Sequence, residues 1–157
     1  MNYDELNAAL SALTADVPHP LANLSNAAAL LWQEMKDVNW AGFYLLADPA
    51  LLVLGPFQGK PACIEIPVGR GVCGTAAARG ETVVVPDVHL FPGHIACDAA
   101  SESEIVVPLK IGGRLVGVLD IDSPKKNTFG EDDRAVLERF AEILSSALPG
   151  DFPASLL

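Results

Sequence analysis

Three cysteines, Cys63, Cys73 and Cys97, are the residues most able to do chemistry in this chain. Their number is odd and they form no C-x-x-C pair. In a reducing compartment this pattern indicates catalytic, redox or metal-binding thiols rather than a disulfide framework. Cys97 lies in the polar stretch 93–104, which is rich in Ala and Ser and predicts a loop. A loop thiol beside carboxylates is a candidate reactive group, although most free cysteines are small buried hydrophobic residues.

Cys73 follows a glycine-rich stretch, residues 69–74, which we expect to enter a short helix. A thiol near a helix N-terminus can have a lowered pKa, so Cys73 is a second candidate. The alternative, a small side chain needed for close helix packing, is favoured here. The stretch does not fit G-x-G-x-x-G and lacks the Lys-Ser/Thr of a phosphate loop, so it does not favour nucleotide binding.

Asp120 and Asp122 end an otherwise apolar strand, and residues two apart on a strand share a face. Two carboxylates so close are unfavourable unless a cation binds or one of them is protonated. A tight hairpin around residues 112–113 places Glu104 near Ile121 and its neighbours on the next strand. Three acids could therefore converge on one cavity floor. The alternative is a solvated strand end with surface acids, and the sequence leaves both open.

The elements that must position these residues follow from hydrophobic periodicity and turn signals. Helices are expected over residues 2–13, 21–37 and 130–148, the last opened by a capping box of Thr128 and Glu131. Strands are expected over residues 40–46, 51–54, 62–66, 82–85, 105–109 and 115–121. The long loop 86–103 carries Cys97, and such loops in compact domains are usually functional or disordered.

This order of elements predicts one domain over residues 1–157. It comprises N-terminal helices over 2–37, a sheet and active-site loops over 40–122, and a C-terminal helix over 130–148. Consecutive hairpins indicate an α+β fold with an antiparallel sheet. We expect the terminal helices to cover one face of the sheet, and loops plus a short helix to cover the other. This architecture resembles a GAF or PAS domain, in which a ligand lies between the sheet and the middle loops.

Composition limits the function. The formal net charge of -10 argues against nucleic acid or an anionic membrane surface as partner. The acidic N-terminus lacks the features of a signal peptide, and no apolar run approaches the ~20 residues of a membrane span. We therefore expect a cytoplasmic protein. Half of the residues are hydrophobic, which is enough to bury a full core.

Six short segments of the chain form a pattern that is found in a known family. They are GPFQGK at 55–60, PVGRGVCGT at 67–75, DVH at 87–89, GHIACDAAS at 93–101, SEIV at 103–106 and GVLDIDS at 117–123. This set closely resembles the free methionine-(R)-sulfoxide reductases, which are GAF-domain enzymes. The resemblance runs from about Trp40 to Phe140 and includes three cysteines in the family's order. The segment 93–101 is specific, whereas the hydrophobic strands alone would be weak evidence.

By this resemblance Cys97 would be the nucleophile, Cys63 the resolving thiol and Cys73 an accessory thiol. The substrate pocket would be lined by Trp40, Tyr44, Glu104, Asp120 and Asp122. The reaction would reduce free methionine-(R)-sulfoxide through a Cys97 sulfenic acid and then a disulfide. Thioredoxin would reduce that disulfide by exchange. The resemblance implies no metal and no cofactor, and the amphipathic terminal helices could pair in a homodimer.

Two alternatives from other functional classes stay open. A GAF module could sense a small molecule such as a cyclic nucleotide or a tetrapyrrole, without catalysis. A metal protein could use His89, His94 and Cys97, which are spaced H-x4-H-x2-C. Visible absorption would reveal a bound tetrapyrrole, and metal analysis would reveal the second alternative.

Overall fold

The structure, a computed structural model, describes residues 3–95, 100–154 and 156. Its helices are α1 (Tyr3–Thr14), α2 (Pro20–Glu34), α3 (Gly71–Arg79) and α4 (Glu131–Ser146), with a 3-10 turn η1 (Val88–Leu90). Its strands are β1 (Trp40–Asp48), β2 (Leu51–Gly59), β3 (Glu65–Pro67), β4 (Val83–Val85), β5 (Ser103–Ile111) and β6 (Arg114–Ser123). The strands form one sheet in the order β3-β2-β1-β6-β5-β4, with antiparallel neighbours. The predicted α+β fold is confirmed.

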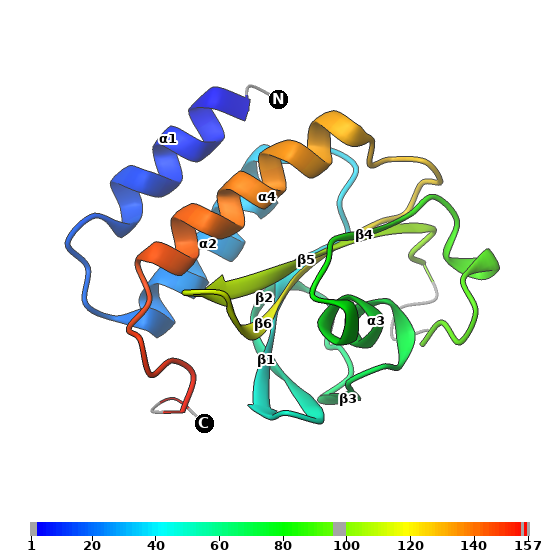
Figure 1. Ribbon diagram of the computed structural model, residues 1–157. Coiled ribbons are helices and arrows are strands. Elements are labelled where there is room, and N and C mark those ends of the chain that lie inside the picture. Colours follow the sequence, from blue (N-terminus) through cyan, green and yellow to red (C-terminus); the bar gives the residue numbers. More distant parts are fainter. Residues whose placement is uncertain (1–2, 96–99, 155, 157) are drawn as a thin grey trace.

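The two faces of the sheet carry different layers. α1, α2 and α4 lie on one face, while α3 and the middle loops lie on the other (Figure 1). Because side chains alternate along a strand, Phe43 and Leu119 pack under the three long helices and Trp40 and Val118 pack on the α3 side. This is the layering that the order of elements predicted.

The start of α4 differs from the prediction. The helix begins at Glu131, and its N-cap is Gly130 rather than Thr128. The carboxylate of Asp133 accepts a hydrogen bond from the Gly130 N–H at 2.8 Å, so the acidic partner lies two residues further along than expected. The Thr128 hydroxyl instead hydrogen-bonds the Ser123 hydroxyl at 2.6 Å, and thereby joins the helix entry to the end of β6.

Three other boundaries differ from the prediction. α2 ends at Glu34, and β2 continues through the expected turn at 55–61. Gly55 and Pro56 lie in a bulge opposite Phe43, where a proline without an N–H is tolerated. β3 has only three residues, so the expectation that Cys63 lies on a strand is wrong. Within the part of the chain that is described, every helix is too short or too polar to cross a membrane.

Candidate active site

Two paired strands, β5 and β6, supply three acids, Glu104, Asp120 and Asp122, which we call the acidic floor. Glu104 lies directly opposite Asp122, a neighbour of Ile121, as the tight hairpin predicted. The partner is one residue further along β6 than a hairpin without a bulge would give, because Val116 is an extra residue between the pairs 110–115 and 109–117. A shift of one residue reverses the face of every side chain beyond it. The bulge therefore brings Glu104 onto the face of Asp120 and Asp122.

Burial gives the acidic floor an unusual protonation state. Glu104 and Asp120 are each 6% exposed. Burial, followed by the charges of Asp120 and Asp122, raises the pKa of Glu104 well above its usual range. Burial also raises the pKa of Asp120, against the opposing effect of hydrogen bonds from Glu104, Cys73 and Asp122. Neighbouring buried carboxyls cannot all ionise at little cost, so the floor retains a proton that it could donate.

One oxygen of the acidic floor is left for a ligand. Asp120 Oδ1 is buried and accepts no hydrogen bond from the described residues, although Asp120 lines a cavity. A buried oxygen without a donor is unfavourable by about 1–3 kcal/mol. A ligand carrying an ammonium or other N–H group would remove that penalty.

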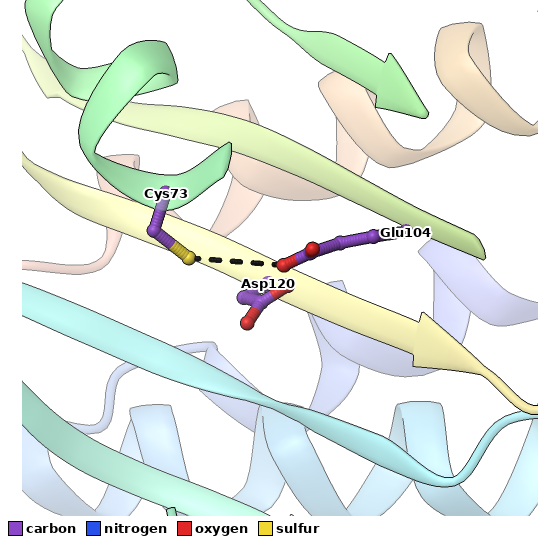
Figure 2. A group of neighbouring side chains, drawn as sticks. All are labelled: Cys73, Glu104 and Asp120. Atoms are coloured by element: carbon purple, nitrogen blue, oxygen red, sulfur yellow. Dashed lines mark hydrogen bonds between the residues drawn. The ribbon is translucent and has the colours of Figure 1, made fainter. Parts of the chain in front are cut away.

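Cys73 lies above the acidic floor, in the first turn of α3. Its Sγ is 4.0 Å from Glu104 Oε2, and Figure 2 shows the thiol pointing toward the carboxyls of Glu104 and Asp120. Burial, followed by the charges of Asp120 and Glu104, raises the pKa of Cys73 well above its usual range. The helix N-terminus does not lower this pKa, because a buried thiolate would face two acids. The burial of Cys73 agrees with the favoured alternative, a small side chain packed at the start of the helix. Cys73 is a protonated thiol that can donate to the floor.

Two aromatic residues of β1, Trp40 and Tyr44, form a wall beside the floor. Trp40 stacks on Tyr44 with ring centroids 5.8 Å apart and on Phe57 with centroids 5.1 Å apart. Their polar atoms donate hydrogen bonds to the segment that follows β2. Trp40 Nε1 donates to the Lys60 carbonyl at 3.1 Å, and the Tyr44 hydroxyl donates to the Cys63 carbonyl at 2.9 Å. Burial is the main cause that raises the pKa of Tyr44 far above its usual value, so it stays a phenol.

The two cysteines that the structure describes are in different states. Cys63 lies in the connection between β2 and β3, is partly exposed and is disulfide-bonded. Cys73 is a free thiol. Cys97, the predicted nucleophile, lies outside the described residues.

The floor and the wall line a cavity of about 50 Å³. All five predicted pocket residues and Cys73 line it. The lining also includes residues that the sequence did not predict for the pocket, among them Arg70, His94, Ile95 and Ser101. His94 Nε2 lies 3.9 Å from Glu104 Oε1. Burial, followed by the charge of His89, lowers the pKa of His94. Its place in the specific segment 93–101 was the signal that could have selected it for the pocket.

Close packing explains why one residue of the cavity lining, Gly71, is a glycine. Gly71 opens α3 with φ +63, and a Cβ there would approach Ile95 Cγ1 to 3.1 Å. Only glycine satisfies both the positive φ and the short distance without strain. The glycine-rich stretch thus serves to bring Cys73 and Ile95 close to the floor.

Metal ligation has two geometric candidates among the described residues. Cys73, Glu104 and Asp120 offer one sulfur and two oxygen ligands within 4.8 Å of one another, and Asp87, His89 and Glu102 form a second, more exposed group. His89 hydrogen-bonds Glu102 at 3.0 Å, whereas His94 lies beside a different acid, Glu104. In the alternative of a metal protein, His89 and His94 would share one metal with Cys97. The groups found among the described residues do not combine the two imidazoles, and Cys97 lies outside those residues.

Comparison with known proteins adds to this geometry. The family model of the GAF domain matches residues 5–148. A free methionine-R-sulfoxide reductase of Escherichia coli is 53% identical over 146 residues, which are 93% of this chain and 88% of that protein. The chain belongs to the free methionine-R-sulfoxide reductase family. The predicted family is therefore confirmed.

Solved structures of reductases agree with this assignment. The Staphylococcus aureus protein in complex with its substrate superposes with a TM-score of 0.89 at 49% identity, covering 94% of this chain and 96% of that chain. The Neisseria meningitidis reductase, also in complex with its substrate, gives a TM-score of 0.88 at 49% identity, over 92% of this chain and 87% of that chain. Both proteins share the whole architecture on which the acidic floor and aromatic wall are built.

Proposed function

We propose that this chain is an oxidoreductase that reduces free methionine-(R)-sulfoxide to methionine. The observation that carries the proposal is a proton-retaining acidic floor inside a cavity lined by Ala62, the residue before the disulfide-bonded Cys63. Sulfoxide reduction needs an acid, a thiol nucleophile and a second thiol that regenerates the first. The family's substrate complexes support the choice of substrate.

In the first step the Cys97 thiolate attacks the sulfoxide sulfur while Glu104 supplies a proton to the sulfoxide oxygen. The S–O bond of the substrate breaks and the oxygen passes to Cys97, which becomes a sulfenic acid as methionine leaves. The raised pKa of Glu104 makes it a carboxylic acid at neutral pH, which is the state that this step needs. Cys73 supports the acid by donating its thiol proton to the floor.

Asp120 and Asp122 would bind the ammonium group of the free amino acid. Asp120 Oδ1 has no donor among the described residues, and a substrate ammonium would supply one. A peptide-bound methionine sulfoxide has an acylated nitrogen without charge, so the site would select the free amino acid. Trp40 would pack against the S-methyl group.

In the second step the Cys63 thiol attacks the Cys97 sulfur, water leaves and a disulfide forms. The disulfide bond of Cys63 supports this role for Cys63 rather than for Cys73, which is a free thiol. A dithiol protein such as thioredoxin would then return both cysteines to thiols. A cytoplasmic location and a homodimer through the terminal helices stay predictions.

The cavity is small for the proposed substrate. A volume of about 50 Å³ is enough for a few water molecules at ~10–15 Å³ each, so lining side chains would have to move to admit an amino acid. The prediction that the loop 86–103 closes over the pocket when the disulfide forms stays a prediction, because its residues 96–99 lie outside the described part of the chain. Closure over bound substrate would exclude water and strengthen its contacts with the acidic floor.

The test is to incubate the protein with racemic free methionine sulfoxide and dithiothreitol, and to follow each diastereomer by chiral chromatography. We expect the R form to disappear while the S form and a peptide-bound sulfoxide survive. Equal consumption of the peptide substrate would show that the acidic floor does not select a free ammonium. Consumption of neither diastereomer would refute the proposed function.

A further inference from the structure

The segment that carries Cys63 is held by hydrogen bonds to the carbonyls of Cys63 and of the residue after it. The Tyr44 hydroxyl donates to the Cys63 carbonyl at 2.9 Å, and the Leu54 N–H of β2 donates to the Ile64 carbonyl at 2.9 Å. Two consecutive carbonyls are therefore bound to different strands. The disulfide sulfur of Cys63 is presented from a fixed backbone, although the residue lies in no strand.

Ile64 is the next residue, and its exposed fraction is 71%. A single exposed apolar side chain is ordinary on a protein surface, so exposure alone carries no function. Ile64 differs because it adjoins a disulfide cysteine and because the hydrogen bond from Leu54 holds its backbone. It offers a rigid apolar contact directly beside a sulfur that must be reduced.

We propose that Ile64 is the contact point for a protein dithiol reductant, and that this reductant attacks Cys63. The proposal rests on the proposed function, in which the disulfide is reduced in every turnover. A protein cannot reach the disulfide through a cavity of about 50 Å³, so it must approach from the outer surface, where Ile64 is exposed. Because this chain has a net charge of -10, a charged contact would require a basic surface on the reductant, whereas an apolar contact does not.

The exchange balances in thiols and electrons. A thiolate of the reductant attacks Cys63 Sγ, the existing S–S bond breaks, and the former partner cysteine leaves as a thiolate. The second thiol of the reductant then attacks its own sulfur in the mixed disulfide and releases Cys63. The reductant is oxidised to a disulfide and both cysteines of this chain are reduced. The partner released first is the proposed nucleophile, Cys97, which is thus ready for the next substrate.

The experiment compares a protein reductant with a small one on the same variant. Ile64→Asp is assayed with free methionine-(R)-sulfoxide, using either thioredoxin or dithiothreitol to recycle the disulfide. We expect kcat/KM for thioredoxin to fall about tenfold, corresponding to about 1.4 kcal/mol of lost contact, mainly through KM. The rate with dithiothreitol should stay within about twofold, because a small dithiol needs no docking surface.

The matched control is Leu21→Asp. Leu21 is 51% exposed and lies in α2, on the opposite face of the sheet from the cavity, whereas Ile64 precedes β3. The control should leave both rates unchanged, and thermal unfolding should show that neither exposed substitution disturbs the fold. Ile64→Val should recover most of the activity with thioredoxin, since it keeps an apolar contact.

A trapping experiment identifies the attacked sulfur. A thioredoxin variant that lacks its second thiol should accumulate as a mixed disulfide, and peptide mapping should find it on Cys63. A mixed disulfide on another cysteine overturns the proposal, as does equal thioredoxin activity in Ile64→Asp and wild type. If the wild type reduces no sulfoxide with either reductant, the proposed function fails and the docking surface fails with it.

Discussion

The two faces of β6 show how this chain separates stability from chemistry. Leu119 and Ile121 point into an apolar core under α1, α2 and α4, where both are fully buried. Asp120 and Asp122 alternate with them on the same strand and point toward α3. Burial of the first pair stabilises the fold by about 1.5–3 kcal/mol per side chain. Burial of the second pair opposes folding unless protons or hydrogen bonds compensate.

The largest expected effect removes the proposed nucleophile and leaves intact the helical face, which is the side of β6 under α1, α2 and α4. Cys97→Ser should yield no methionine even in a single turnover, because the proposed attacking sulfur is gone. Cys63→Ser should still release one equivalent of methionine per chain but fail to recycle with thioredoxin. Quantifying methionine after mixing enzyme and substrate without reductant distinguishes the two. A stoichiometric burst from Cys97→Ser would move the nucleophile to another thiol, with Cys73 the next candidate.

A smaller loss should follow removal of the acid. Glu104→Gln keeps the shape of the side chain but cannot donate a proton, so kcat should fall by about 10²–10⁴-fold. In the wild type, kcat/KM should decrease as pH rises through the raised pKa of Glu104. That decrease should be absent from the residual activity of the variant. An unchanged pH profile in Glu104→Gln would assign the proton donor to another group.

The helical face should respond in the opposite way. Leu119→Ala removes a fully buried side chain from the apolar core and should lower the free energy of unfolding by about 2–5 kcal/mol. Ile121→Val, a milder change on the same face, should lower it by about 0.5–1.5 kcal/mol. Urea unfolding measures both. The molecules that remain folded should keep wild-type kcat within about twofold, and a large loss of kcat would show that the two faces are coupled.

Hydrophobic alternation is enough to predict these two faces, but not the position of Glu104. The apolar strands, the antiparallel sheet and the layer of terminal helices all follow from periodicity and turn residues. Glu104 reaches the acidic floor only because Val116 bulges out of the ladder. Without that bulge it would lie on the face of Leu119. Gly117, the residue after the bulge, is a weak cue, since a glycine within a strand often marks one.

Other features depend on contacts that a local pattern cannot show. The run 62–66 is apolar enough to predict a strand, yet only its end pairs with β2, and Cys63 is held instead by a hydrogen bond from Tyr44. His94 enters the pocket through the folding of a loop, for which the sequence has no periodicity. The pKa of Cys73 depends on acids 31 and more residues away along the chain. That distance is why helix position alone could not decide between a reactive and a packed Cys73.

A pH titration of stability should separate the two faces further. The pKa of Glu104 is higher in the folded chain than in the unfolded one. The native state therefore binds more protons, and stability falls as pH rises from the ordinary glutamate range through the raised pKa. Glu104→Gln should flatten this dependence and raise the melting temperature at pH 8, by about 2–4 °C for each kcal/mol gained. Leu119→Ala should shift the whole curve downward without changing its slope.

The smallest expected effect concerns Tyr44, which belongs to the α3 face but acts on the backbone. Its single hydroxyl proton is donated to the Cys63 carbonyl at 2.9 Å, so the same proton is not available to the sulfoxide oxygen. Tyr44→Phe keeps the ring that stacks on Trp40 and removes only this hydrogen bond, which is worth about 0.5–1.5 kcal/mol. Formation of methionine in a single turnover should be unchanged. Formation of the disulfide should slow by a few-fold, because Cys63 is less firmly positioned.

Trapping the sulfenic acid with dimedone measures that second step directly. Tyr44→Phe should leave a larger fraction of the protein labelled than wild type at the same time after mixing with substrate. Tyr3→Phe is the matched control, since it also removes a tyrosine hydroxyl hydrogen bond, the one to Asp133 between α1 and α4, away from the cavity. It should affect trapping less than Tyr44→Phe does. A lower methionine burst in Tyr44→Phe with normal disulfide formation would instead place the phenol in the chemical step, and Tyr44 would then act on the substrate rather than on Cys63.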